Sequence, residues 1–168
     1  MEMWDLYDEK RKLAATDHIR GTELPDNCYH LVVHIWIKNR KGQYLISQRA
    51  ENRPTHPLLW ECVGGSVQKG ENSLQGAVRE VKEEVGIDLS NIEGKIVFSK
   101  TRGIIDGKKF NDILDVWLFE YNAAVSLKQA TTDEVAQTKW LYPEQIKELY
   151  NSRQLVPTLE YFFDKINI

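Results

Sequence analysis

The sequence predicts a single α/β domain in which a mixed β-sheet lies between helical layers. Strand-like segments come first, one amphipathic helix follows them, further strands come next, and two helices end the chain. The 168 residues suffice for one domain with a substantial core and leave little room for a second. We therefore expect residues 1–168 to form one domain.

Before the first helix we expect an N-terminal extension at 1–28, strands at 29–38, 43–49 and 59–63, and a Gly-rich turn after Val63 that runs to Glu71. A Pro25-Asp26-Asn27 turn ends the extension, and β-branched and aromatic residues mark the strand that follows. Pro54 and Pro57 interrupt the path to the third strand. The glycines would let the backbone approach a ligand closely.

The first helix is expected between Asn72 or Ser73, either of which can act as the N-cap, and Gly86, which suits a left-handed C-terminal residue. Its apolar residues recur every three or four positions and form one stripe: Leu74, Ala77, Val78, Val81 and Val85. Later strands are expected at 94–102, 112–121 and 137–141. Helices follow Tyr142 and Val156, where Pro143 and Pro157 occupy first helical positions.

Three carboxylates lie together on the side of this helix opposite the apolar stripe. At 100° per residue, Glu80, Glu83 and Glu84 fall within roughly 100° of one another. Gly76 lies in the same arc, so another backbone segment could approach there. The carboxylates would repel one another unless a cation lay among them, and their hard oxygens suit Mg²⁺ or Mn²⁺. A solvated acidic face is the alternative, but the Gly-rich segment ahead of the helix favours a metal site to which Gly65 could add its carbonyl.

The spacing of residues 65–87 follows the pattern G-x5-E-x7-R-E-U-x-E-E-x-G-U, where U is aliphatic, and fills every fixed position. This segment resembles the signature, or box, of the Nudix hydrolases. The resemblance implies an α/β/α sandwich and a Mg²⁺-dependent hydrolase, with Mn²⁺ as an alternative ion. Such an enzyme is a pyrophosphatase that cleaves nucleoside diphosphates linked to another moiety. It also implies that Arg79 orients a box carboxylate, through a bidentate contact with Glu71 or Glu83.

A catalytic base must come from the box or from outside it. Glu80 and Glu84 share the face better suited to metal ligation, which leaves Glu83 as a base or a further ligand. The second candidate is Glu134, because the family often carries a Glu in a loop ahead of the last sheet strand; a surface role for Glu134 is equally compatible with the sequence. Weaker candidates are Asp106, Asp112 and Asp115.

Two other classes of protein share this fold. The similarity extends over residues 4–141 to a Nudix branch near isopentenyl-diphosphate isomerase, which uses a cysteine just before the box glycine and a nearby metal-binding histidine. Here Cys62 stands two residues too early and the box is complete, although His30 falls where the isomerase has its metal-binding histidine. The third hypothesis is a non-catalytic nucleotide-sensing module. Such modules often lose box glutamates, which this sequence retains, and carry an additional domain.

Composition limits the partners. A net charge of −3 gives no electrostatic case for binding a nucleic-acid polymer. The N-terminus lacks a signal-peptide core and no 18-residue apolar run occurs, so we expect a cytoplasmic protein with no membrane association. The expected partner is a small diphosphate-containing substrate, and a homodimer is left open. Substrate-binding residues cannot be read from the box, because substrate loops vary freely on one fold.

The cysteines and two of the histidines are expected to be structural. Cys28 and Cys62 belong to no spaced motif and should be reduced. On a strand, His30 and His34 share a face about 13 Å apart, which is too far for one metal ion.

Overall fold

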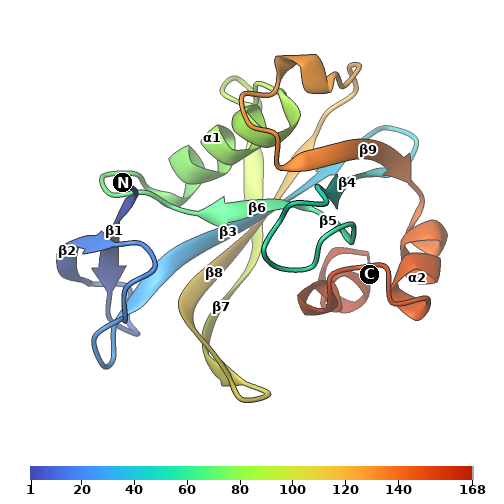
Figure 1. Ribbon diagram of the computed structural model, residues 1–168. Coiled ribbons are helices and arrows are strands. Elements are labelled where there is room, and N and C mark those ends of the chain that lie inside the picture. The colour runs from blue at the N-terminus through green and yellow to red at the C-terminus, as the bar shows by residue number, and fades with distance from the viewer. Residues whose placement is uncertain (168) are drawn as a thin grey trace.

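The computed structural model describes residues 1–167 and contains a mixed sheet between two helical layers, as predicted (Figure 1). Its strands are β1 (Met3–Tyr7), β2 (Leu13–Ile19), β3 (Tyr29–Lys38), β4 (Tyr44–Arg49), β5 (Trp60–Glu61), β6 (Val63–Ser66), β7 (Gly94–Ile105), β8 (Lys108–Glu120) and β9 (Val135–Leu141). Its α-helices are α1 (Ser73–Val85) and α2 (Pro143–Asn151). Short 3₁₀ turns occur at Leu127–Gln129 and Pro157–Leu159, and a π-helical turn at Phe162–Ile166. In this part of the chain, no helix is long and apolar enough to cross a membrane.

Strand β3 lies at the centre of the sheet. It pairs in parallel with β8, from His30 opposite Asp112 to Lys38 opposite Glu120, and antiparallel with β1, β4 and β6. Strand β4 also pairs antiparallel with β5 and with β9. Strand β5 pairs with β4, whereas β6 pairs with β3. The chain therefore crosses at Cys62 from the branch of the sheet that contains β4 to the branch that contains β3. This crossing brings Glu61 and Gly65 to the junction of the branches.

Alternation along β3 divides the core into two layers. Leu31, Val33 and Ile35 face α1, whose buried residues complete the first cluster. Trp36 faces the other way and packs with α2 and the C-terminal segment in the second cluster. Figure 1 shows α1 and α2 on opposite sides of the sheet. Each face of the sheet is therefore covered, which explains the nearly continuous apolar run of β3.

The N-terminal extension is part of the sheet, which the sequence did not indicate. Strands β1 and β2 form a hairpin, and β1 pairs with β3. The turn of this hairpin is attached to β8, because Arg11 donates to both oxygens of Asp115, at 2.7 and 2.8 Å. Burial alone would raise the pKa of Asp115, whose side chain is 0% exposed, but hydrogen bonds from Arg11, Ser73 and Ser99 hold it below its ordinary value.

Two expected elements differ in the structure. Residues 63–66, predicted as the end of a strand and the start of a Gly-rich turn, form β6, because pairing with β3 holds Gly64 and Gly65 extended. The C-terminal segment begins at Pro157 as expected but forms 3₁₀ and π turns instead of an α-helix. So short a segment gains little from helix propagation, and the packing of Tyr161 and Phe162 against Trp36 determines its shape.

His30 and His34 make separate aromatic and polar contacts. His30 stacks on Trp4, with ring centroids 4.0 Å apart, and its buried Nδ1 has no hydrogen-bond partner within residues 1–167. Burial lowers the pKa of His30 to about 4, helped by the nearby charges of Arg102 and Arg20 and opposed by Asp112. The His34 Nδ1 lies 2.7 Å from the Tyr161 hydroxyl, and burial lowers the pKa of His34 to about 3.

The pKa of His30 predicts a specific acid sensitivity. Because its pKa in the folded state lies below the unfolded value of 6.5, the unfolded state binds more protons between about pH 6.5 and pH 4. The stability that depends on neutral His30 is complete above pH 6.5 and is lost as the pH falls; by pH 5 the loss amounts to about 2 kcal/mol. Replacing His30 with Phe keeps the stack on Trp4 and removes the unpaired buried nitrogen. Urea unfolding at pH 7 and pH 5 should therefore show a smaller drop for His30→Phe than for the wild type; equal drops would contradict this assignment.

Candidate active site

Helix α1 is fixed at both ends by the residues that the sequence indicated. Asn72 is the N-cap: its side chain accepts from the Gln75 backbone N–H at 2.8 Å, while the Gln75 side chain accepts from the Asn72 N–H at 2.9 Å. Gly86 ends the helix at φ 74°, in the left-handed region. A Cβ on Gly86 would lie 2.6 Å from the Cβ of Gln129, so the 3₁₀ turn of Gln129 packs directly on the helix end. The position of the acidic side chains along the helix axis is thus set.

Arg79 contacts three carboxylates and a backbone carbonyl, which together we call the Arg79 network. Nε and Nη2 donate to the two oxygens of Glu71 at 2.7 and 3.0 Å, which is the bidentate contact expected with Glu71 or Glu83. Nη1 donates to Glu80 at 3.0 Å and Glu83 at 3.2 Å, and Nη2 also donates to the Ser66 carbonyl at 3.0 Å. Burial alone would lower the pKa of Arg79, but Glu71 and Glu80 raise it above its ordinary value. One permanent cation thus links the helix to β6 and to the turn before it.

Glu80 lies directly against Gly65. A Cβ on Gly65 would lie 2.3 Å from the Glu80 carboxylate carbon, a distance that no real side chain could adopt. The absence of a side chain at Gly65 therefore makes the space that this carboxylate fills. Gly76 also permits close packing, but its neighbour is the Val67 side chain, 2.7 Å from a Cβ at Gly76, and not the backbone segment that we expected.

The acidic arc of α1 is not a solvated face. Glu84 is 6% exposed, and Glu80 is largely enclosed by β6. Burial raises the pKa of Glu80 to about 7, against the lowering effect of Arg79. Burial also raises the pKa of Glu84 well above its ordinary value, and the charges of Glu80, Glu61 and Glu134 add to this rise. We call Glu61, Glu80, Glu84 and Glu134 the acidic cluster.

Glu134 reaches this cluster through backbone contacts that hold its loop against α1. The Glu83 carbonyl, in the last turn of the helix, accepts from the backbone N–H groups of Thr131 and Thr132 at 2.9 and 3.1 Å. The Glu134 carbonyl accepts from the Ala50 N–H at 2.9 Å. The candidate base outside the box is thereby brought beside Glu80 and Glu84. The Glu83 side chain, the other candidate, is 35% exposed and bonded to Arg79.

Glu61 is the member of the cluster that sequence reasoning missed. It lies on the two-residue strand β5 between buried Trp60 and Cys62, and burial raises its pKa. Nη1 of Arg49 donates to both of its oxygens, at 2.9 and 3.0 Å. A charged residue between two buried ones was the available signal, but only the crossing between the two branches of the sheet places it beside α1.

The loop after β4 supplies a further cation, Arg53. The three aspartates proposed as weaker candidates lie elsewhere. Nη2 of Arg53 pairs with Glu134 at 3.0 Å. Asp112 is bonded to Arg102, Asp115 to Arg11, and Asp106 lies in the turn between β7 and β8.

The residues fit a divalent cation by donor type and by electrostatics. Two buried carboxylates one helical turn apart, with a glycine backbone against one of them, offer the hard oxygen ligands that Mg²⁺ and Mn²⁺ prefer. Burial raises the pKa of Glu84 most, and repulsion from the neighbouring carboxylates adds to it; a bound cation would offset both effects. In residues 1–167, no group of three or more His, Cys, Asp or Glu side chains is already arranged to hold a metal ion.

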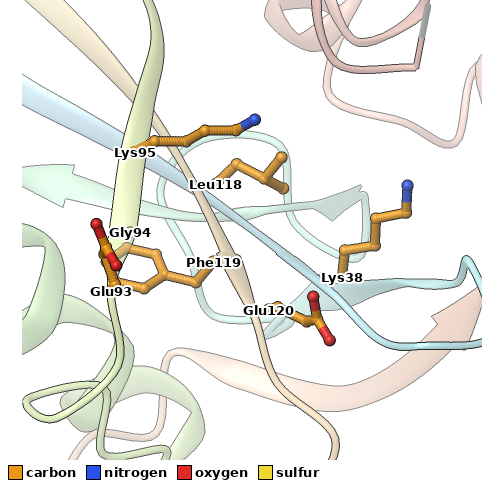
Figure 2. Close-up of a pocket in the computed structure, with 7 residues that line it drawn as sticks. All are labelled: Lys38, Glu93, Gly94, Lys95, Leu118, Phe119 and Glu120. Carbon is orange, nitrogen blue, oxygen red and sulfur yellow. The ribbon is translucent and has the colours of Figure 1, made fainter.

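A cavity of about 320 Å³ at the ends of β3 and β8 is separate from this cluster (Figure 2). Its lining residues are Lys38, Glu93, Gly94, Lys95, Leu118, Phe119 and Glu120. Figure 2 shows the Lys95 side chain running alongside Leu118, with Lys38 on the other side of Leu118. None of these residues belongs to α1, β5 or β6, so this cavity does not contribute to the acidic cluster.

Comparisons with known proteins identify the family. The NUDIX domain family matches residues 29–162. An uncharacterized Nudix hydrolase of Listeria innocua is 39% identical over 166 residues, which are 97% of this chain and 91% of that protein. The crystal structure of DR0079 from Deinococcus radiodurans has a TM-score of 0.73 and 20% identity, and the match covers 92% of each chain.

Two further likenesses are more distant. The isopentenyl-diphosphate Delta-isomerase of Shigella flexneri is 28% identical over 121 residues, which are 68% of this chain and 63% of that enzyme. The NUDIX domain of Shewanella oneidensis NrtR, solved in complex with ADP ribose, has a TM-score of 0.56 at 18% identity and covers 84% of this chain and 82% of its own. Because the family match covers most of the residues and a relative of similar length is 39% identical, this chain belongs to the Nudix family and is a Nudix hydrolase.

Proposed function

We propose that this enzyme hydrolyses a diphosphate linkage in a nucleoside diphosphate joined to another moiety, with Mg²⁺ as its cofactor and Mn²⁺ as an alternative. The observation that carries this proposal is the buried pair Glu80 and Glu84: burial raises the pKa of both, and the Glu80 carboxylate lies against Gly65. Buried carboxylates that repel one another lower the stability of the fold unless a bound cation offsets their charge. ADP ribose bound to the NrtR domain supports a nucleotide-derived substrate on this fold.

In this proposal Glu80, Glu84 and the Gly65 carbonyl would hold the metal, and Glu83 would be a further ligand. The bound metal would neutralise phosphate oxygens and stabilise the charge that develops on them during hydrolysis. Arg79 keeps the Glu80 carboxylate in place through its 3.0 Å bond. Because Arg79 also holds Glu71 and the Ser66 carbonyl, it fixes the helix relative to β6. Its role is to position the carboxylates.

We propose that Glu134 is the base that activates water. It lies beside the two metal-binding carboxylates but belongs to a separate loop, whereas Glu83 is engaged by Arg79. The water oxygen attacks phosphorus, its proton passes to the Glu134 carboxylate, and the leaving phosphate retains the electron pair of the broken P–O bond. Arg53, whose Nη2 lies 3.0 Å from Glu134, would help to hold this carboxylate in place.

The isomerase-like reaction is disfavoured by the state of Cys62. This thiol is 2% exposed, and burial raises its pKa well above the ordinary value, so it is a poor thiolate donor. We further propose that the enzyme acts in the cytoplasm on a small molecule and not on a nucleic-acid polymer.

A substrate panel with Mg²⁺ and ¹⁸O-labelled water, analysed by mass spectrometry, tests the proposal. The panel should contain nucleotide sugars, dinucleoside polyphosphates, ADP-ribose, oxidised dNTPs and isopentenyl diphosphate. We expect one nucleotide-derived compound to be cleaved, with the label on one phosphate product. Conversion of isopentenyl diphosphate to its allylic isomer without incorporation of label would replace the proposal with the isomerase function.

Replacing Glu80 or Glu84 with Gln should separate activity from stability. Each change removes a metal ligand, and we expect kcat to fall by about 10²- to 10³-fold, as when one electrostatic contact to the transition state is lost. Thermal unfolding in EDTA should show a midpoint equal to or above that of the wild type, because the neutral amide removes a buried charge. Near-normal turnover of both variants at limiting Mg²⁺ would refute the assignment.

Replacing Gly65 with Ala should displace Glu80, because the new Cβ would lie 2.3 Å from its carboxylate carbon. A shift of about 1 Å in a positioned group can lower turnover by about 100-fold. The matched control is Gly103→Ala, since a Cβ on Gly103 would meet no atom within 4 Å. Steady-state kinetics should show the loss for Gly65→Ala alone. Full activity of Gly65→Ala would show that the close contact with Glu80 has no catalytic importance.

A further inference from the structure

A cavity of about 670 Å³ lies between the β7–β8 hairpin and the C-terminal segment. Figure 1 shows this hairpin extending past the rest of the sheet. Three aromatic rings line the cavity, those of Phe98, Phe110 and Tyr161, and Phe98 meets Tyr161 edge to face at 4.9 Å. A volume of this size holds a small organic molecule, and flat apolar walls favour a planar ring.

The cavity also contains a nearly buried cation with unused donors. Arg102 is 8% exposed and binds Asp112 through Nε and Nη2, both at 2.7 Å. Its guanidinium stacks on Phe110, with Cζ 4.7 Å from the ring centroid. Nη1 makes no hydrogen bond within residues 1–167, and it keeps contact with solvent. A guanidinium held rigidly on two sides, with its remaining N–H groups free, is suited to donate to an acceptor on a bound molecule.

The charges around the cavity exclude a simple anion. Besides Arg102 its lining has two lysines, Lys100 and Lys165, and three carboxylates, those of Asp106, Glu160 and Asp164. Because positive and negative groups balance, a phosphate gains little there. A molecule with carbonyl acceptors, amino or imino donors and a flat face matches the lining, and nucleobases have all three features.

The cavity borders the region of the acidic cluster through Tyr161. The Tyr161 ring lines the cavity, while its hydroxyl accepts from the Trp36 indole N–H at 3.0 Å and is a hydrogen-bond neighbour of the Cys62 thiol. Cys62 follows Glu61, a member of the acidic cluster, in the chain. One aromatic side chain thus lies between the cavity and the crossing that carries Glu61. The charges of Glu61 and Glu84 also act on the Cys62 thiol, so Tyr161 joins the cavity to a residue within range of the acidic cluster.

We propose that this cavity binds the nucleobase of the substrate and that Arg102 selects bases with a carbonyl group over adenine. The inference rests on the proposed hydrolysis of a nucleotide-derived substrate. Uracil, cytosine and guanine each present an exocyclic carbonyl oxygen that can accept from Nη1 of Arg102, whereas the exocyclic group of adenine is an amine, which donates, and its acceptors are ring nitrogens. A hydrogen bond to a charged donor is worth about 1.5–3 kcal/mol, which corresponds to roughly 10-fold or more in affinity.

Binding of uridine and adenosine to the whole chain in EDTA tests the proposal. Neither nucleoside carries phosphate and no metal is present, so the acidic cluster contributes nothing. Titrations followed by ¹H–¹⁵N NMR should give a Kd for uridine about 10-fold below that for adenosine, with shifts at Phe98, Phe110 and Tyr161. Equal affinities, or shifts confined to other residues, would overturn the proposal.

Two variants and a matched control show where the nucleoside binds. Thr158 is exposed and lines the cavity, so Thr158→Trp should fill it without disturbing the fold and raise the Kd for uridine at least about 10-fold, whereas Thr158→Ser should change it little. The double variant Arg102→Gln/Asp112→Asn keeps a hydrogen-bonded pair without charge and should make the two affinities equal. Unchanged uridine binding by Thr158→Trp, or a retained preference in the double variant, contradicts the proposal.

The same preparations distinguish this inference from the proposed function. Mg²⁺-dependent hydrolysis of a nucleotide-derived compound, without nucleoside binding in this cavity, would overturn the inference alone. Uridine binding in the cavity without divalent-dependent hydrolysis of any compound in the panel would instead overturn the proposed function.

Discussion

The arrangement of the site depends on one cation among several carboxylates. Arg79 binds Glu71, Glu80, Glu83 and the Ser66 carbonyl at once, so its planar guanidinium holds α1, β6 and the turn between them in one geometry. A fixed fork of five donors loses less entropy for each bond formed than a flexible ammonium would. Without it, the helix would retain its apolar packing, but the direction of its carboxylates would no longer be determined.

The acidic cluster lowers the stability of the fold. Burial raises the pKa values of Glu61, Glu80 and Glu84, so each of these carboxylates destabilises the fold when ionised. The nearby arginines offset part of this cost, since Arg49 is bonded to Glu61 and Arg53 to Glu134. The split of the sheet at Cys62 makes the arrangement feasible, because it brings a charged strand residue to the helix. A loss of stability of this kind is typical of binding sites.

Local rules were sufficient for α1 and its carboxylates. Caps, periodicity and box spacing all act within about twenty residues. They predicted the ends of the helix and a bidentate contact from Arg79 to Glu71 or Glu83, of which the structure has the contact with Glu71. Features that depend on distant pairing were not predictable in this way. Glu61 joins the cluster only through the crossing from β5 to β6, and the β1–β2 hairpin joins the sheet through β3 and Asp115. The burial of the acidic arc likewise comes from β6 and the loop of Glu134, which the helical pattern alone cannot show.

The most direct test of the account compares Arg79→Lys with the wild type in turnover and in urea unfolding. A lysine retains the charge, but its single ammonium cannot span Glu71, Glu80 and the Ser66 carbonyl together. We expect kcat to fall by about 100-fold, the effect of a misplaced catalytic group, while the unfolding free energy changes by about 1–2 kcal/mol. An unchanged kcat would show that Arg79 contributes charge alone and would contradict its role in positioning the carboxylates.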